Sequence, residues 1–272
     1  KMHKEEKEIT KKVDGVDKKE KKTWEYFEMS DYKYITYQEF ADKVLLISSG
    51  LVHLGLGNDT RFNIYASTAV NWQLMAHSCF AQGITFCTAY DTLGEEGLQH
   101  SLDEPEVVGV FTNADLLPML GKVVKDCPHL KYVIYDGKDE KGALSKVEEV
   151  LKEREGRAIH IDELIKEGKA NPAKKNPPKP EDTAAIMYTS GSTGKPKGVI
   201  LKQSNIVAAI GAVLMLLGKE LQPNETFLAY LPLAHILEFV VECALMSAGV
   251  TMGYGKVKTL TSNSTKNCLG DL

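Results

Sequence analysis

The chain has 272 residues, 43% hydrophobic and 26% charged, a balance typical of a globular protein with a sizeable core. Its 33 Lys and Arg residues against 37 Asp and Glu residues give a net charge of −4, which argues against a nucleic-acid partner, because such partners select a clustered basic excess. The five cysteines form no CxxC pair and have no metal-ligand spacing, so we expect reduced cysteines in a cytoplasmic protein: Cys79, Cys87, Cys127, Cys243 and Cys268.

Residues 1–35 form a charged segment in which we expect a β-hairpin and a strand. Lysine and glutamate dominate its first part, and Asp14-Gly15 is a typical hairpin turn. Residues 24–37 then alternate aromatic and polar side chains, a pattern that predicts a half-exposed strand.

Residues 36–170 form the first α/β part of the predicted fold. Thr36 and Glu39 have the spacing of a capping box and open a predicted helix that ends at Gly55 and Gly57. Short apolar runs then alternate with helix-length segments, which predicts parallel strands with helices covering both faces of the sheet. The expected strands are 62–67, 84–90, 107–112 and 132–136, and the helices begin near Ala69, Gly94, Asn113 and Lys141.

A proline-rich connector, residues 171–182, separates this part from a second α/β part, residues 183–272. In the second part we expect strands at 184–189 and 227–232, and helices over 203–218 and from 236. The apolar runs 206–218 and 239–255 are too short and too interrupted to span a membrane, so they predict buried helices.

The stretch YTSGSTGKPKGV, Tyr188 to Val199, follows a predicted buried strand and is dense in glycines, hydroxyls and lysines. Glycines let backbone N–H groups approach a ligand closely, while hydroxyls add donors and lysines add positive charge. This composition favours a loop that holds a polyphosphate over a flexible linker. It is not a Walker A loop, because only two residues separate Gly191 from Gly194.

The same stretch resembles the phosphate-binding signature of the adenylate-forming superfamily, which includes acyl-CoA synthetases and luciferases. A second block, YLPLAHILEFVVE (230–242), is similar to the next motif of that superfamily. Three flanking phrases resemble the fungal long-chain fatty-acid–CoA ligases: IYASTAVNW (64–72), TAYDTLGEEGLQHSL (88–102) and GYGKVKTLT (253–261). The resemblance implies an α/β fold of layered parallel sheets with flanking helices, as part of the superfamily's N-terminal domain.

The resemblance also implies an activity. A long-chain fatty acid would react with ATP, with Mg²⁺ present, to give an acyl-adenylate and pyrophosphate, and coenzyme A would then take the acyl group and release AMP. A ligase for a shorter or aromatic acid, a non-catalytic nucleotide- or acyl-binding module, and a purely structural α/β protein are the alternatives that the sequence leaves open.

Residue roles follow from the resemblance alone. Lys197 and His235 are the implied catalytic residues, and Thr189 is the implied contact to Mg²⁺. His235 has an ordinary alternative as a cap or packing residue at a helix start, and Glu238 is expected to be structural. The implied phosphate-binding residues are Thr189, Ser190, Gly191, Ser192, Thr193, Gly194 and Lys197.

The adenine, ribose and lid motifs of the superfamily do not occur in these 272 residues, so we expect a fragment that is inactive as a ligase on its own. We expect a cytoplasmic protein, and a fatty-acid substrate predicts peripheral contact with the endoplasmic reticulum or with lipid droplets. Acyl chain length and oligomeric state are left open.

Overall fold

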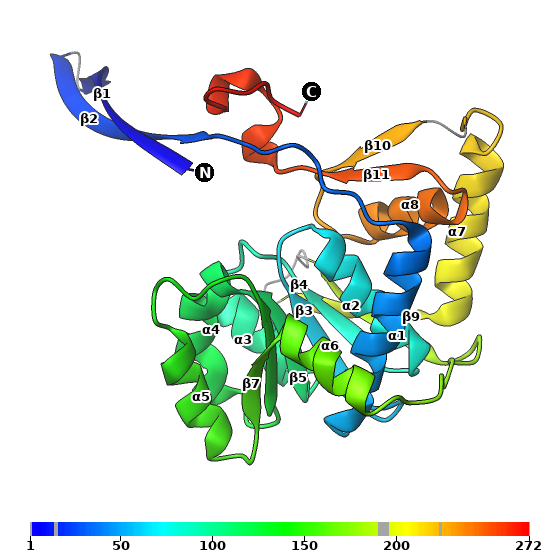
Figure 1. Cartoon of the computed structure of the whole chain (residues 1–272). Coiled ribbons are helices and arrows are strands. Elements are labelled where there is room, and N and C mark those ends of the chain that lie inside the picture. The colour runs from blue at the N-terminus through cyan, green and yellow to red at the C-terminus, as the bar shows by residue number, and fades with distance from the viewer. Residues whose placement is uncertain (1, 14–15, 190–195, 223–224, 272) are drawn as a thin grey trace.

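A seven-stranded sheet forms the centre of the computed structural model, which describes residues 2–13, 16–189, 196–222 and 225–271 (Figure 1). Six of its strands are parallel, in the order β7-β6-β5-β3-β4-β8, and β9 lies antiparallel at the edge. The strands are β3 (Arg61–Tyr65), β4 (Thr85–Ala89), β5 (Gly109–Asn113), β6 (Tyr132–Asp136), β7 (Arg157–His160), β8 (Thr183–Thr189) and β9 (Lys197–Lys202). The expected α/β fold with a mainly parallel sheet is therefore confirmed.

Helices cover both faces of this sheet, because side chains at successive strand positions point to opposite sides. Phe62 and Ile64 of β3 join a core with α1, α2 and α6, whereas Tyr65 joins a second core with α3, α4 and α5. The helices are α1 (Tyr37–His53), α2 (Val70–Ala81), α3 (Glu95–Asp103), α4 (Leu117–Val123), α5 (Leu144–Lys152) and α6 (Ile161–Ala170). Short 3₁₀ turns, Ala114–Leu116 and Val124–Asp126, flank α4.

The capping box predicted at the start of α1 is present. The Thr36 side chain accepts a hydrogen bond from the Glu39 backbone N–H, and the Glu39 carboxylate accepts one from the Thr36 N–H. The apolar stripe of the helix faces the first core, where Ile47 and Leu51 are fully buried.

The edge strand β9, which was not predicted, is the exception to the parallel arrangement. β9 pairs antiparallel with β8, with Thr189 opposite Lys197. Only seven residues separate the two strands, whereas a parallel connection needs a dozen or more. The sequence analysis also did not predict β7 and α6, because the residues that form these two elements lie in a charged stretch of the sequence.

The N-terminal hairpin consists of β1 (Met2–Val13) and β2 (Val16–Phe27), and it extends away from the sheet (Figure 1). Its predicted turn, Asp14-Gly15, lies outside the described residues. The strand expected over 24–37 ends at Phe27, since only that part has a partner strand; residues 28–36 are neither helix nor strand. The base of the hairpin contacts the C-terminal segment through Lys266, which forms an ion pair of 2.6 Å with Glu5.

Residues 171–182 contain neither helix nor strand, as expected for a proline-rich connector. The sheet continues across this connector, because β8 pairs with β4. Strands from both sides of the connector therefore belong to one sheet. The division of the chain into two parts at 171–182 stays a prediction.

After β9 the chain forms α7 (Gln203–Leu217), β10 (Thr226–Ala229), α8 (Ile236–Ser247) and β11 (Thr251–Tyr254), followed by 3₁₀ turns at Val257–Thr259 and Ser262–Ser264. β10 and β11 pair in parallel as a separate two-stranded sheet. α8 is buried as predicted, but α7 is not: Val207 is 65% exposed and Met215 85%. Only Ile206 of α7 is fully covered by other described residues. None of the helices in the described ranges is long and apolar enough to cross a bilayer.

A buried polar cluster fixes α8 to α2 and β11. The Glu242 carboxylate accepts hydrogen bonds from Gln73 Nε2 at 2.9 Å and from the Tyr254 hydroxyl at 2.8 Å. Glu238, one turn earlier on α8, is also buried and interacts with Glu242. Burial raises the pKa of Glu242 to about 8, and the neighbouring Glu238 acts in the same direction. Burial therefore favours the protonated form of Glu242 in the folded chain.

Two glycines allow α1 and α6 to pack closely. A Cβ atom at Gly168 would lie 1.9 Å from the Leu46 carbonyl oxygen, and one at Gly50 would lie 2.6 Å from the Leu164 carbonyl oxygen. We expect Gly168→Ala to lower the free energy of unfolding by about 1–3 kcal/mol, because the helices must separate. Gly211→Ala in α7, where a Cβ meets no atom within 4 Å, is the matched control. It should raise stability by up to about 1 kcal/mol through helix propensity. Thermal unfolding measures both, and equal melting temperatures for the two variants would contradict the packing.

The Glu242 carboxyl makes stability depend on pH. Its folded pKa of about 8 lies above the ordinary value of 4.5, so the unfolded chain loses this proton first. The free energy of unfolding should therefore fall as pH rises from about 5 to about 8. Glu242→Gln mimics the protonated acid and should flatten this fall, leaving the variant more stable than the wild type at pH 8. Glu149→Gln, at an exposed position on α5, is the control and should keep the wild-type slope. Urea unfolding at pH 5 and pH 8 tests this, and a Glu242→Gln variant with the wild-type slope would refute it.

Candidate functional site

A cavity of about 330 Å³ opens at the carboxyl ends of β4 and β8. The two strands end side by side because they pair in parallel. Open α/β sheets place their ligands beyond the carboxyl ends of the strands, which is where this cavity lies. The reversal of strand order falls between β3 and β5, two neighbouring strands that contribute no residue to the cavity wall. The walls of the cavity include Tyr90, Thr189, Pro196, Ala234 and His235.

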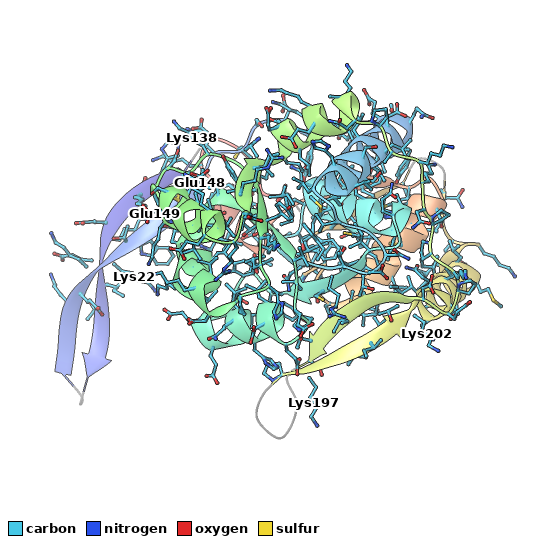
Figure 2. All side chains as sticks on the ribbon, turned by 90° about the horizontal axis from the view of Figure 1, so that it is seen from below. Lys22, Lys138, Glu148, Glu149, Lys197 and Lys202 are labelled. Carbon is cyan, nitrogen blue, oxygen red and sulfur yellow. The ribbon has the colours of Figure 1, made fainter. Side chains whose placement is uncertain are left out.

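The ends of the predicted phosphate loop lie at this edge. Thr189 is the last residue of β8, Lys197 is the first of β9, and the two are paired across the ladder with both side chains exposed. Figure 2 shows the Lys197 side chain pointing away from the body of the protein. The other five predicted phosphate-binding residues lie outside the described residues: Ser190, Gly191, Ser192, Thr193 and Gly194.

His235 both caps α8 and lines the cavity. Its Nδ1 atom accepts a hydrogen bond of 3.2 Å from the Leu237 backbone N–H, so in the neutral ring the proton is on Nε2. Nε2 is therefore left to donate to a ligand. The N-terminus of α8 adds the positive end of a helix dipole at the same place. His235 is thus both a helix cap and part of the cavity wall, while its catalytic role stays a prediction.

Two threonines that were not singled out in the sequence hold the segment before α8 in place. Thr68 accepts a hydrogen bond from the Leu233 N–H at 2.9 Å and donates one to the Leu231 carbonyl at 2.7 Å. Thr88, fully buried near the end of β4, donates to the Ala234 carbonyl at 3.2 Å. The sequence feature that could have identified these two threonines is a polar residue near the end of each predicted apolar strand. These bonds tie the His235 segment to the carboxyl ends of β3 and β4.

The donors near the loop ends fit a magnesium ion that arrives with a nucleotide. Among the described residues no group of three or more His, Cys, Asp and Glu side chains is placed to hold a metal ion. Thr189 contributes a single hydroxyl. Mg²⁺ is commonly held by one or two protein oxygens together with substrate phosphates, which is compatible with this sparse donor set.

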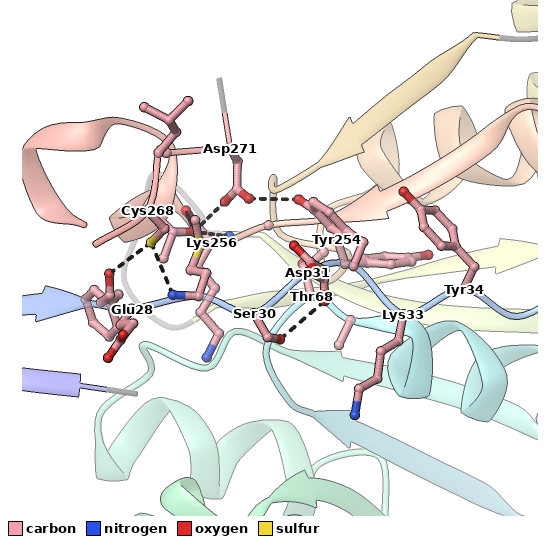
Figure 3. Close-up of a pocket in the computed structure, with 18 residues that line it drawn as sticks. Glu28, Ser30, Asp31, Lys33, Tyr34, Thr68, Tyr254, Lys256, Cys268 and Asp271 are labelled. Atoms are coloured by element: carbon pink, nitrogen blue, oxygen red, sulfur yellow. Dashed lines mark hydrogen bonds between the residues drawn. The ribbon is translucent and has the colours of Figure 1, made fainter. Parts of the chain in front are cut away.

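A larger cleft, of about 980 Å³, lies between residues 27–34 and the C-terminal segment (Figure 3). Asp271 accepts a hydrogen bond of 2.8 Å from the Tyr32 hydroxyl across it, and Cys268 Sγ accepts one of 3.3 Å from the Met29 N–H. Tyr254 borders this cleft and not the cavity beside His235. The hydroxyl of Tyr254 is engaged by Glu242, which gives it a structural role.

Known proteins resemble the chain along its full length. It is 42% identical to long-chain-fatty-acid–CoA ligase 1 of Schizosaccharomyces pombe, covering 100% of this chain and 40% of that protein. It is 41% identical to long-chain-fatty-acid–CoA ligase 4 of Saccharomyces cerevisiae, covering 100% of this chain and 41% of the relative. The chain therefore spans about 40% of the length of these curated relatives.

Solved structures share the fold. The adenylation domain of a carboxylate reductase from Mycobacterium chelonae superposes with a TM-score of 0.75 at 18% identity, over 96% of this chain and 40% of that one. A long-chain-fatty-acid–CoA ligase from Archaeoglobus fulgidus gives a TM-score of 0.67 at 18% identity, over 85% and 42%. Residues 15–270 match the family described as AMP-binding enzyme, and the chain belongs to that family.

Proposed function

We propose that this chain forms the phosphate-binding and acyl-activating part of an ATP-dependent long-chain-fatty-acid–CoA ligase. The observation that supports this most directly is that Thr189 and His235 line one cavity, while Lys197 is paired with Thr189 at the adjoining strand end. The names of the fungal relatives support the substrate class. The similarity to both relatives extends through the loop and the His235 segment, since it covers the whole chain.

The proposed reaction has two steps. A carboxylate oxygen of the fatty acid attacks the α-phosphorus of ATP, and the bond to the β-phosphate oxygen breaks, which releases pyrophosphate and leaves an acyl-adenylate. The thiolate of coenzyme A then attacks the acyl carbon, and AMP leaves with the electron pair of the broken C–O bond. Charge on phosphate oxygens must be stabilised in the first step, and positioned donors and cations do this best.

The described residues suit that task. Lys197, paired with Thr189, would offer an ammonium group to the β- and γ-phosphates, where negative charge grows as pyrophosphate leaves. His235 donates from Nε2 to an oxygen of the acyl carboxylate or of the α-phosphate, while Nδ1 stays bound to the helix cap. The N-terminus of α8 adds to the attraction for an anion at the same point. Bound Mg²⁺ would supply a Lewis acid for the phosphate oxygens, with Thr189 as the protein contact.

The test is ATP–pyrophosphate exchange over a range of carboxylic acids. Because the chain spans about 40% of its relatives, exchange is measured after joining it to the remaining part of the S. pombe ligase. We expect exchange that is fastest with long-chain fatty acids. Preference for a short or aromatic acid would change the substrate class. MgATP binding without exchange for any acid would favour a nucleotide-binding module.

Lys197→Ala should slow the adenylation step of this chimera roughly a hundredfold, because losing one such contact in a water-poor site costs about 2–4 kcal/mol. Transfer of the acyl group from supplied acyl-adenylate to coenzyme A should change little. Lys202→Ala removes the same charge at the other end of β9 and is the matched control (Figure 2). Its exchange rate should equal that of the wild type. A Lys197→Ala variant that keeps normal exchange but melts at a much lower temperature would show that the lysine is structural.

A further inference from the structure

The last turn of α3 contacts both strands that flank the predicted phosphate loop. His100 Nε2 lies 2.9 Å from the carbonyl oxygen of Pro196, the residue before β9. The Glu104 carboxylate accepts a hydrogen bond of 2.8 Å from the hydroxyl of Tyr188, the second-last residue of β8. His100 and Glu104 are one helical turn apart, and His100 Nε2 lies 3.5 Å from the Glu104 carboxylate. One helix end thus joins the end of β8 to the start of β9.

The chemistry of these contacts fixes their direction. A carbonyl oxygen only accepts, so His100 Nε2 carries a proton and donates it to Pro196. Burial raises the pKa of the Tyr188 hydroxyl, and its hydrogen bond to Glu104 acts in the same direction, so this hydroxyl stays a donor. The His100 ring also packs edge-on against the Tyr188 ring, with 5.5 Å between centroids. The three side chains and Pro196 therefore form one connected unit.

The helix that carries this unit is itself held firmly. Leu98 and Leu102 of α3 are buried in the second core. Asn63, buried in β3, donates a hydrogen bond of 2.9 Å from Nδ2 to the Ser101 carbonyl, beside His100. α3 also contributes Gly97 and Ser101 to the wall of the cavity that His235 lines. Contacts with the sheet and the second core therefore fix the position of α3. The contacts of His100 and Glu104 in turn fix the end of β8 and the start of β9 relative to α3.

We propose that His100 and Glu104 are positioning residues, which hold the strand ends at Tyr188 and Pro196 so that Thr189 and Lys197 stay in place for a polyphosphate. Neither residue contacts the ligand in this proposal. The identity of the ligand, MgATP, rests on the proposed function. The hold on the strand ends, meaning their stabilisation by His100 and Glu104, does not depend on that function. The two can therefore be tested separately, the hold on the strand ends in the 272-residue chain and the MgATP affinity in the chimera with the remaining part of the S. pombe ligase.

The experiment compares amide hydrogen exchange in peptides from β8 and β9 with MgATP affinity measured by calorimetry. We expect His100→Ala to speed exchange at the start of β9 about threefold to tenfold and to weaken MgATP binding by a similar factor, as loss of one net hydrogen bond predicts. Tyr188→Phe should act in the same way at the end of β8. His100→Gln should restore both quantities, because its amide nitrogen can donate to Pro196. His129→Ala, at a half-exposed histidine that contacts neither strand, is the control and should match the wild type.

The outcomes separate the two proposals. Unchanged exchange in both His100→Ala and Tyr188→Phe overturns the positioning role, whatever the affinities are. Faster exchange with unchanged MgATP affinity also overturns it, because the hold would then not matter to the ligand. A chimera without substitutions that does not bind MgATP contradicts the proposed function. In that case faster exchange in His100→Ala, restored by His100→Gln, still supports the hold on the strand ends.

Discussion

Parallel pairing of β3, β4 and β8 is the constraint on which the rest of the structure depends. Helices cover both faces of these strands, so their side chains are buried on both sides, and every strand must end at the same edge of the sheet. Groups that line the cavity or hold its wall meet there as a consequence, although they come from distant parts of the sequence. Thr68 follows β3, Thr88 and Tyr90 lie at the end of β4, and Thr189 ends β8. Without this common edge, the predicted phosphate loop would lie on a surface with no neighbouring groups.

Two features added to that edge give it its chemical character. The short return into β9 places Lys197 opposite Thr189, which brings a cation to the end of an otherwise uncharged strand. α8 begins at the same cavity with His235, and the buried cluster around Glu242 fixes the other side of that helix to α2 and β11. Burial raises the pKa of Glu242, which reduces the negative charge that this helix carries behind the site.

The sequence predicted those parts of the fold that depend on local pattern. Strand–helix alternation, the capping box of α1 and the phosphate loop are all local, and the structure contains the first two as expected. The antiparallel β9 was missed because its partner is chosen by the length of a loop. The exposure of α7 was missed because an apolar helix does not reveal which neighbours cover it. His100 and Glu104 look like ordinary surface residues of a helix until β8 and β9 are placed beside them. The division at 171–182, the cytoplasmic location and any membrane contact stay predictions.

A crystal structure of the chain joined to the remaining part of the S. pombe ligase, with Mg²⁺ and a non-hydrolysable ATP analogue, would test the central claim most directly. The account predicts the triphosphate at the carboxyl ends of β4 and β8, with β- or γ-phosphate oxygens within hydrogen-bond distance of Lys197 Nζ and with His235 Nε2 facing the α-phosphate. A triphosphate bound in the cleft between residues 27–34 and the C-terminal segment, with Lys197 making no contact to it, would contradict the account.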